Sequence, residues 1–191
     1  MHRALYFAGV GYLAVCAALV VRHRAAGRAP SPVPSATTPT FDGPPNQWFA
    51  AIKPYCNAVE VEIMQRRHPA PASLDGAGFS AACYALGGKL DLARAVIDRL
   101  PNADRYRAAG IVFAIAHPVA DAGDDRSAGP MMELVIRYWP NHYMALYHAG
   151  MSEYALGELT LAKQNLTAFL SNYHQDDGWT RNARTVLARL R

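Results

Sequence analysis

Residues 84–97 read "YALGGKLDLARAVI", and residues 154–166 read "YALGELTLAKQNL". Each stretch begins with Tyr-Ala-Leu-Gly, continues through a short polar break and then places an alanine inside an apolar stripe. Apolar side chains at three- and four-residue steps are typical of one face of an α-helix. A glycine between two such stripes can supply the left-handed backbone that ends a helix. The two stretches therefore predict a helix pair that occurs at least twice.

The same spacing occurs a third time, midway between the two copies. The three glycine–alanine pairs are Gly88 with Ala93, Gly123 with Ala128, and Gly157 with Ala162. Successive glycines are 35 and 34 residues apart. A fixed period of this length indicates stacked helical repeats. No other stretch of the folded part alternates convincingly in polarity, so the sequence predicts an all-α domain.

This pattern resembles the tetratricopeptide repeat, in which two antiparallel helices occupy about 34 residues. The resemblance covers residues 74–173 and implies three repeats, at about 74–101, 103–139 and 143–173. In the third repeat, Leu146 takes the family's large first-helix position and Gly150 its small position where two helices cross. The second repeat departs from the family because it has extra residues at "AHPVAD", which we expect in a loop.

Amphipathic helices are expected on both sides of the repeats. "WTRNARTVLARLR" predicts a C-terminal capping helix at 178–190, because an uncovered repeat end would leave an apolar face in water. At the other end, residues 48–67 carry an apolar stripe and predict one opening helix that Pro54 starts or kinks. The expected fold is a solenoid of about three repeats between two capping helices.

The N-terminal part has a different composition. Residues 5–21 form a run of 17 residues without charge, which is the low end of what spans a bilayer. We expect residues 1–28 to be a single-pass membrane anchor, with a cleaved signal peptide as the alternative. Residues 29–45 are rich in Pro, Ser and Thr and predict an extended tether. The helical domain is expected to occupy residues 46–191.

The distribution of charge argues against nucleic-acid binding. The whole chain has a net charge of +4, but from residue 46 onward 15 Lys and Arg stand against 14 Asp and Glu. A nearly neutral domain offers no electrostatic surface for a phosphate backbone. The arginines that flank the anchor favour a cytoplasmic domain. In the families that this chain resembles, a Pro/Ser/Thr tether after such an anchor is typical of domains held outside the cytoplasm, and we prefer the periplasmic side.

Catalytic and cofactor motifs are not found. The chain has no Gly-x-Ser-x-Gly, His-Glu-x-x-His or glycine-rich phosphate loop, so we expect neither an enzyme nor a bound cofactor. His142 and His148 lie on opposite faces of one predicted helix and do not indicate a shared metal. The alternative is an enzyme or cation-binding module that uses the Asp121, Asp124 and Asp125 loop.

Cys56 and Cys83 allow two interpretations. We expect each to be a small buried apolar residue on a helix. The alternative is a disulfide between the opening helix and the first repeat, which requires an oxidising compartment.

The resemblance implies a partner-binding groove along the first helices of the repeats. Its third-repeat positions are Met144, Tyr147, Met151 and Tyr154, and its second-repeat positions are Asp104, Arg107 and Ile111. Tyrosine and methionine on an exposed stripe favour contact with a partner. We therefore expect a non-enzymatic, membrane-anchored scaffold that serves as an accessory or assembly subunit of a membrane protein complex. The capping helix is the alternative cover for this stripe.

Overall fold

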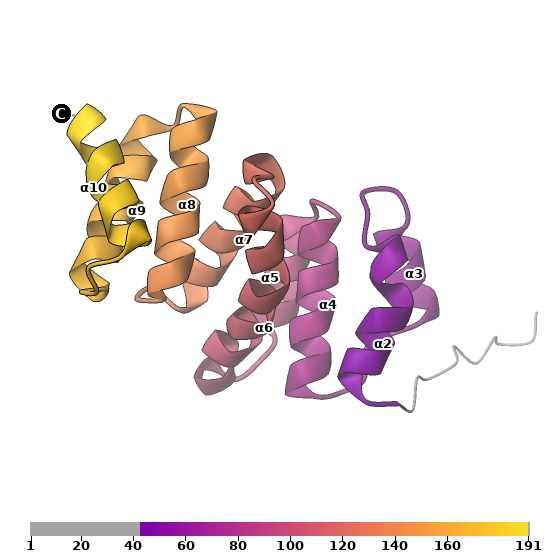
Figure 1. The fold of residues 1–191 in the computed structure, drawn as a ribbon. Helices are drawn as coiled ribbons and strands as arrows, with labels where there is room; N and C mark the ends of the chain where they lie inside the picture. The colour runs from indigo at the N-terminus through magenta and orange to yellow at the C-terminus, as the bar shows by residue number, and fades with distance from the viewer. Residues whose placement is uncertain (1–42, 191) are drawn as a thin grey trace, which may run out of the picture. The chain divides into compact units, whose positions relative to one another are not determined.

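The computed structural model describes residues 43–190, and the predicted anchor and most of the tether lie outside that range. The described part contains helices and no strand, which confirms the all-α prediction for these residues. Figure 1 shows its helices following one another along the fold in sequence order. They are α2 (Pro45–Ile52), the 3-10 helix η1 (Lys53–Tyr55), α3 (Val61–Arg67), α4 (Leu74–Leu86), α5 (Leu90–Asp98), α6 (Asn102–Asp121), α7 (Asp125–Tyr138), α8 (Tyr143–Leu156), α9 (Leu159–Asn172) and α10 (Gly178–Arg189).

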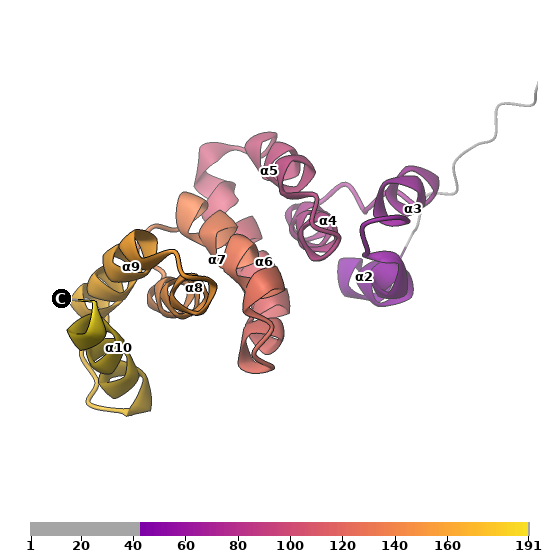
Figure 2. The same ribbon diagram turned by 90° about the horizontal axis from the view of Figure 1, so that it is seen from above.

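Three consecutive helix pairs make up most of the fold: α4 with α5, α6 with α7, and α8 with α9. The turn inside each pair contains a glycine with positive φ, at 71° for Gly88, 77° for Gly123 and 84° for Gly157. Residues that carry a side chain rarely adopt this backbone conformation. The glycines, which are 35 and 34 residues apart, therefore mark three equivalent turns. The first helix of the first and second pairs also packs on a helix of the next pair, as Figure 2 shows from above.

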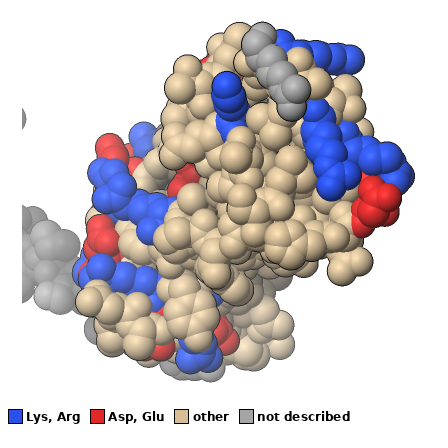
Figure 3. Space-filling view, turned by 90° about the vertical axis from the view of Figure 1, so that its left-hand side faces the viewer, with Lys and Arg blue, Asp and Glu red and all other residues tan. Residues whose placement is uncertain are grey.

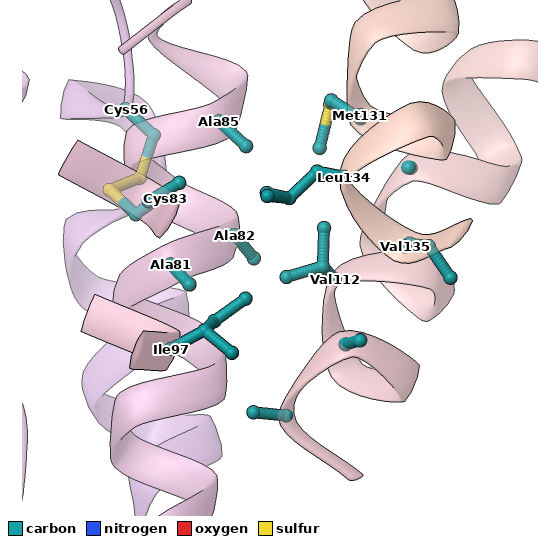
Figure 4. Close-up of a cluster of buried hydrophobic side chains, with 14 of the residues drawn as sticks. Cys56, Ala81, Ala82, Cys83, Ala85, Ile97, Val112, Met131, Leu134 and Val135 are labelled. Atoms are coloured by element: carbon teal, nitrogen blue, oxygen red, sulfur yellow. A yellow bond between two sulfur atoms is a disulfide. The ribbon is translucent and has the colours of Figure 1, made fainter. Parts of the chain in front are cut away.

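Small residues allow these helices to approach closely. Ala81, Ala82 and Ala85 are buried on α4, and in Figure 4 Ala82 and Ala85 face the apolar side chains of α6 and α7 while Ala81 lies beside Ile97 of α5. Gly150 is buried between α8 and α9, where a Cβ atom would lie 2.7 Å from Cγ of Leu166. The expected close crossing at Gly150 is therefore present, because no side chain fits there without displacing α9.

The predicted opening helix is broken into three short pieces. Pro54 lies inside η1, and a turn separates η1 from α3. Val59 in that turn is 82% exposed, and Tyr55 and Ile63 are also exposed, so the predicted apolar stripe ends after Ile52. The prediction of one helix over 48–67 was wrong, since the proline ends α-helical hydrogen bonding where the stripe appeared to continue.

The six residues "AHPVAD" do not form the expected loop. They extend α6, which has 20 residues, whereas α4 has 13 and α8 has 14. Pro118 lies inside this extension without ending the helix. The placement of an irregular loop at these positions was therefore wrong, and its consequence is that His117 and Asp121 are held on a rigid helix.

Helix α10 lies where the capping helix was expected. Asp177 and Thr180 form a capping box at its start, and Ala183 and Val186 are buried against the third pair. No helix within residues 43–190 is long and apolar enough to cross a membrane.

Candidate functional site

The predicted stripe on α8 is largely covered. Met144 and Tyr147 are only 7% and 6% exposed, and Met151 and Tyr154 are half-buried against the same apolar cluster. The cover is α10: the ring of Trp179 lies 6.5 Å from that of Tyr147, and Asn182 Nδ2 donates a hydrogen bond to Tyr147 Oη at 3.4 Å. The expectation that Met144 and Tyr147 are exposed was wrong, because both belong to the buried cluster that includes Ala183 and Val186 of α10.

The second-repeat positions on α6 are divided between surface and core. Arg107 is exposed and pairs with Asp104 at 3.7 Å, as expected for a polar surface. Ile111 instead packs toward α4, where a Cβ on Gly78 would meet its side chain. Only Asp104 and Arg107 of this trio therefore lie on the polar surface that the sequence predicted.

An open groove lies at the other end of the domain. Its volume is about 730 Å³, and its walls come from α4, from the end of α5 and from the segment between α3 and α4. The lining is mostly apolar and small, with Pro69, Ala70, Pro71, Ala72, Leu74, Ala77, Val96 and Leu100, and it includes Tyr84 and Arg99. None of the groove residues predicted from the sequence lines this groove, because it lies between α4 and the segment before it, which the repeat pattern treats separately.

Residues 69–72 form the extended wall of the groove. Among the described residues, the backbone N–H groups of Ala70 and Ala72 have no hydrogen-bond partner. Gln65 and Ser80 also line the groove, and there Gln65 Nε2 donates to the carbonyl of Ser80 at 3.0 Å while Ser80 Oγ donates to the Gln65 side chain. These buried hydrogen bonds fix α3 against α4, so the groove has a defined width.

A disulfide between Cys56 and Cys83 closes the loop that carries this wall. Figure 4 shows the bond linking the two segments beside the alanines of α4. The expectation of two separate buried thiols was wrong, and the disulfide alternative is correct. Spacing along the chain could not decide this, since the contact arises from how the segment before α3 folds back on α4.

The three aspartates of the 121–125 segment do not act together. Asp124 caps α7, where its side chain accepts from the Ser127 N–H at 3.2 Å. Asp125 accepts from Ser152 Oγ at 3.0 Å. Two of the three carboxylates thus have structural partners, and only Asp121 points to another group of side chains.

Asp121 lies beside two histidines from different helices. His117 is one turn earlier on α6, and His148 projects from α8. One ligand atom from each of the three residues lies within 4.8 Å of the other two. Asp121 Oδ1 is 3.7 Å from His117 Nε2 and 3.8 Å from His148 Nε2, and the two imidazole rings are 4.8 Å apart.

The electrostatics of this cluster favour neutral imidazole at His148. Burial, followed by the proximity of His117, lowers the pKa of His148 to about 4, although Asp121 and Asp125 oppose the shift. His142 is not part of the cluster, because its Nδ1 accepts the Ala145 N–H at the start of α8. The histidine beside His148 is therefore His117 and not His142. The His-x-x-x-Asp spacing of residues 117–121 would have indicated His117 only if this segment had been predicted as a helix instead of a loop.

The face at the α10 end has few charges in its centre. Figure 3 shows Lys and Arg side chains mainly toward the two sides of this face, with uncharged residues between them. This charge distribution agrees with the nearly neutral composition of the domain.

Comparison with family models, curated proteins and solved structures finds no match to this chain.

Proposed function

We propose that this chain is a non-enzymatic protein-interaction scaffold, held at a membrane by residues 5–21, whose helix pairs are tetratricopeptide-like repeats. In this proposal it is an accessory or assembly subunit of a membrane protein complex. The observation that carries the proposal is the groove of about 730 Å³ beside α4, which has apolar walls, an open mouth and a covalently closed frame. Grooves between packed helices are common sites for a partner's peptide segment.

The groove suits an extended segment with small apolar side chains. Alanine, proline and valine line it, so its contacts with the partner segment would be mainly apolar. The N–H groups of Ala70 and Ala72, which have no partner among the described residues, could pair with the carbonyl groups of an extended strand. Arg99 at the rim favours a carboxylate on the same segment.

The disulfide supports a location outside the cytoplasm. Disulfides persist in oxidising compartments, whereas cytosolic thiols are kept reduced. We therefore propose that residues 46–191 lie on the periplasmic side of the membrane. Protease treatment of spheroplasts tests this: the domain should be digested without lysis, and protection until lysis would contradict the assignment.

The groove is tested with Ala77→Arg, since Ala77 is half-buried in its lining and arginine would fill it. Ala155→Arg is the matched control, because Ala155 is exposed at the end of α8. Both full-length variants are purified from detergent-solubilised membranes, and co-purifying proteins are quantified against wild type.

We expect one partner that is stoichiometric with wild type and Ala155→Arg and is lost with Ala77→Arg, with equal melting temperatures for the three proteins. Val96→Arg, from the opposite wall, should give the same loss. Retention of the partner by both groove variants would contradict the proposal, as would the absence of any stoichiometric partner of wild type.

A further inference from the structure

His117, His148 and Asp121 have no role in the groove beside α4, and their side chains lie close together. We propose that His117, Asp121 and His148 form a binding site for a divalent transition-metal ion, of which zinc is the best-fitting representative. This inference does not depend on the groove beside α4, which is built from other residues.

The distances suit a shared ion better than direct contacts. At 3.7 and 3.8 Å, the separations between Asp121 Oδ1 and the two Nε2 atoms are too long for hydrogen bonds. Ligand atoms that each lie about 2.1 Å from a tetrahedral zinc ion are about 3.4 Å from one another. Small side-chain rotations would therefore bring the three atoms into coordination.

His148 provides the second, independent observation. Its side chain is only 9% exposed, and its Nε2 atom has no hydrogen-bond partner among the described residues. A buried nitrogen without a partner costs free energy that a metal bond would recover. This atom lies beside the Asp121 carboxylate and the imidazole of His117, so the nitrogen without a hydrogen-bond partner belongs to the cluster.

The position of Asp121 also favours a cation. Asp121 is the last residue of α6, and a carboxylate at the C-terminal end of a helix meets the negative end of the helix dipole. A bound cation would reverse that unfavourable interaction. Two imidazoles with one carboxylate select zinc and related ions over magnesium and calcium, which prefer ligand sets made of oxygen atoms.

The coordination would be incomplete without solvent. The Asp121 side chain is 60% exposed and His117 is half-exposed, so water can reach the ion from outside. Three protein ligands and one water correspond to an open tetrahedral site. The ion would join the second and third helix pairs through the extra turns of α6, which supplies two of the three ligands.

Zinc titration of the purified full-length protein in detergent, carrying a tag without histidines, tests the site. His117→Gln and Asp121→Asn remove one ligand each at positions that α6 exposes at least partly. His174→Gln and Asp176→Asn are matched controls on the exposed segment before α10. Calorimetry gives the stoichiometry and affinity, and thermal melting with and without Zn²⁺ gives a second readout.

We expect wild type and both controls to bind one zinc ion that His117→Gln and Asp121→Asn lose or bind far more weakly. The loss should exceed the roughly 10- to 100-fold effect of removing an outer-shell partner. Zinc should raise the melting temperature of wild type and the controls only, because the ion binds the folded state. Equal affinity and equal melting shifts for wild type and the two ligand variants would overturn the site, as would no zinc binding by wild type.

Discussion

The two ends of the helical domain are closed in different ways. At the N-terminal end, short helices pack through Trp48 and Phe49, and the disulfide joins this region to α4. At the C-terminal end, α10 is one regular helix with a capping box, and it docks through side-chain packing without a covalent link. From this difference we infer that the irregular N-terminal cap depends on its disulfide for stability. The amphipathic helix α10, which begins with a capping box, is stable without a covalent link.

The two ends also differ in which surface is open: the groove beside α4 is open, whereas the stripe on α8 is covered. The wall of the groove beside α4 lies within the loop that Cys56 and Cys83 close. The stripe on α8, which the sequence favoured for binding, is the surface on which α10 docks. The Cys56–Cys83 disulfide can hold the groove beside α4 open, while α10 covers the stripe on α8.

Removal of the disulfide should have the largest effect. In a chain-entropy account, a link between residues 27 apart stabilises by about 3.5 kcal/mol. The double variant Cys56→Ala/Cys83→Ala should therefore melt at a clearly lower temperature, as followed by circular dichroism. Added reductant should lower the melting temperature of wild type and leave that of the variant unchanged. A variant as stable as wild type would show that packing alone holds the N-terminal end.

Overpacking of the α8–α9 crossing should come next. Gly150→Leu is expected to destabilise by about 2 kcal/mol or more, because its side chain would collide with Leu166 and with the backbone of α9. Gly178→Ala is the control, since a Cβ there meets nothing within 4 Å. Denaturant unfolding measures both. Unchanged stability of Gly150→Leu would mean that α9 moves away freely and that the C-terminal end is loosely packed.

Loss of the cap on α10 should have a smaller effect. The Asp177 side chain accepts from the Thr180 N–H at 3.1 Å, and caps of this kind contribute about 1 kcal/mol. Asp177→Ala should lower the stability by that amount, and it should increase protease cleavage near α10. Asp176→Ala, at the neighbouring exposed position, should change neither quantity. Equal effects of the two variants would mean that the capping box does not stabilise α10.

The ion pair at the N-terminal end should contribute least. Lys89 Nζ lies 3.1 Å from Glu62 Oε1 and links the turn after α4 to α3, but both side chains are well exposed. Exposed pairs of this kind contribute about 1 kcal/mol or less. Lys89→Gln should therefore change the melting temperature slightly, and high salt should erase that difference. A loss comparable to that of the disulfide would mean that charge, rather than the covalent link, holds this end.

The repeated glycines made the helix pairs predictable, because Gly88, Gly123 and Gly157 are needed where the backbone adopts positive φ. Local periodicity also located α10. It could not locate the break at Pro54, since an apolar stripe can continue through residues that a proline prevents from being helical.

The candidate sites were less predictable because each depends on contacts between distant residues. Whether Cys56 meets Cys83 is decided by the path of the turn before α3. His148 meets His117 only because the extra residues 116–121 lengthen α6 instead of forming a loop. Tyr147 looked like a binding residue in one helix, but α10 covers it. Spacing within one segment contains none of this information.

The central claim is that the groove beside α4 receives a segment of a membrane partner. Site-specific photo-crosslinking in intact membranes tests it most directly, with a photoreactive residue at Ala72 in the groove wall or at Ala155 on the distant end of α8. We predict one crosslinked protein from Ala72 that is absent from Ala155 and that disappears when Ala77→Arg is added. No crosslink from Ala72, or the same crosslink from both positions, would contradict the account.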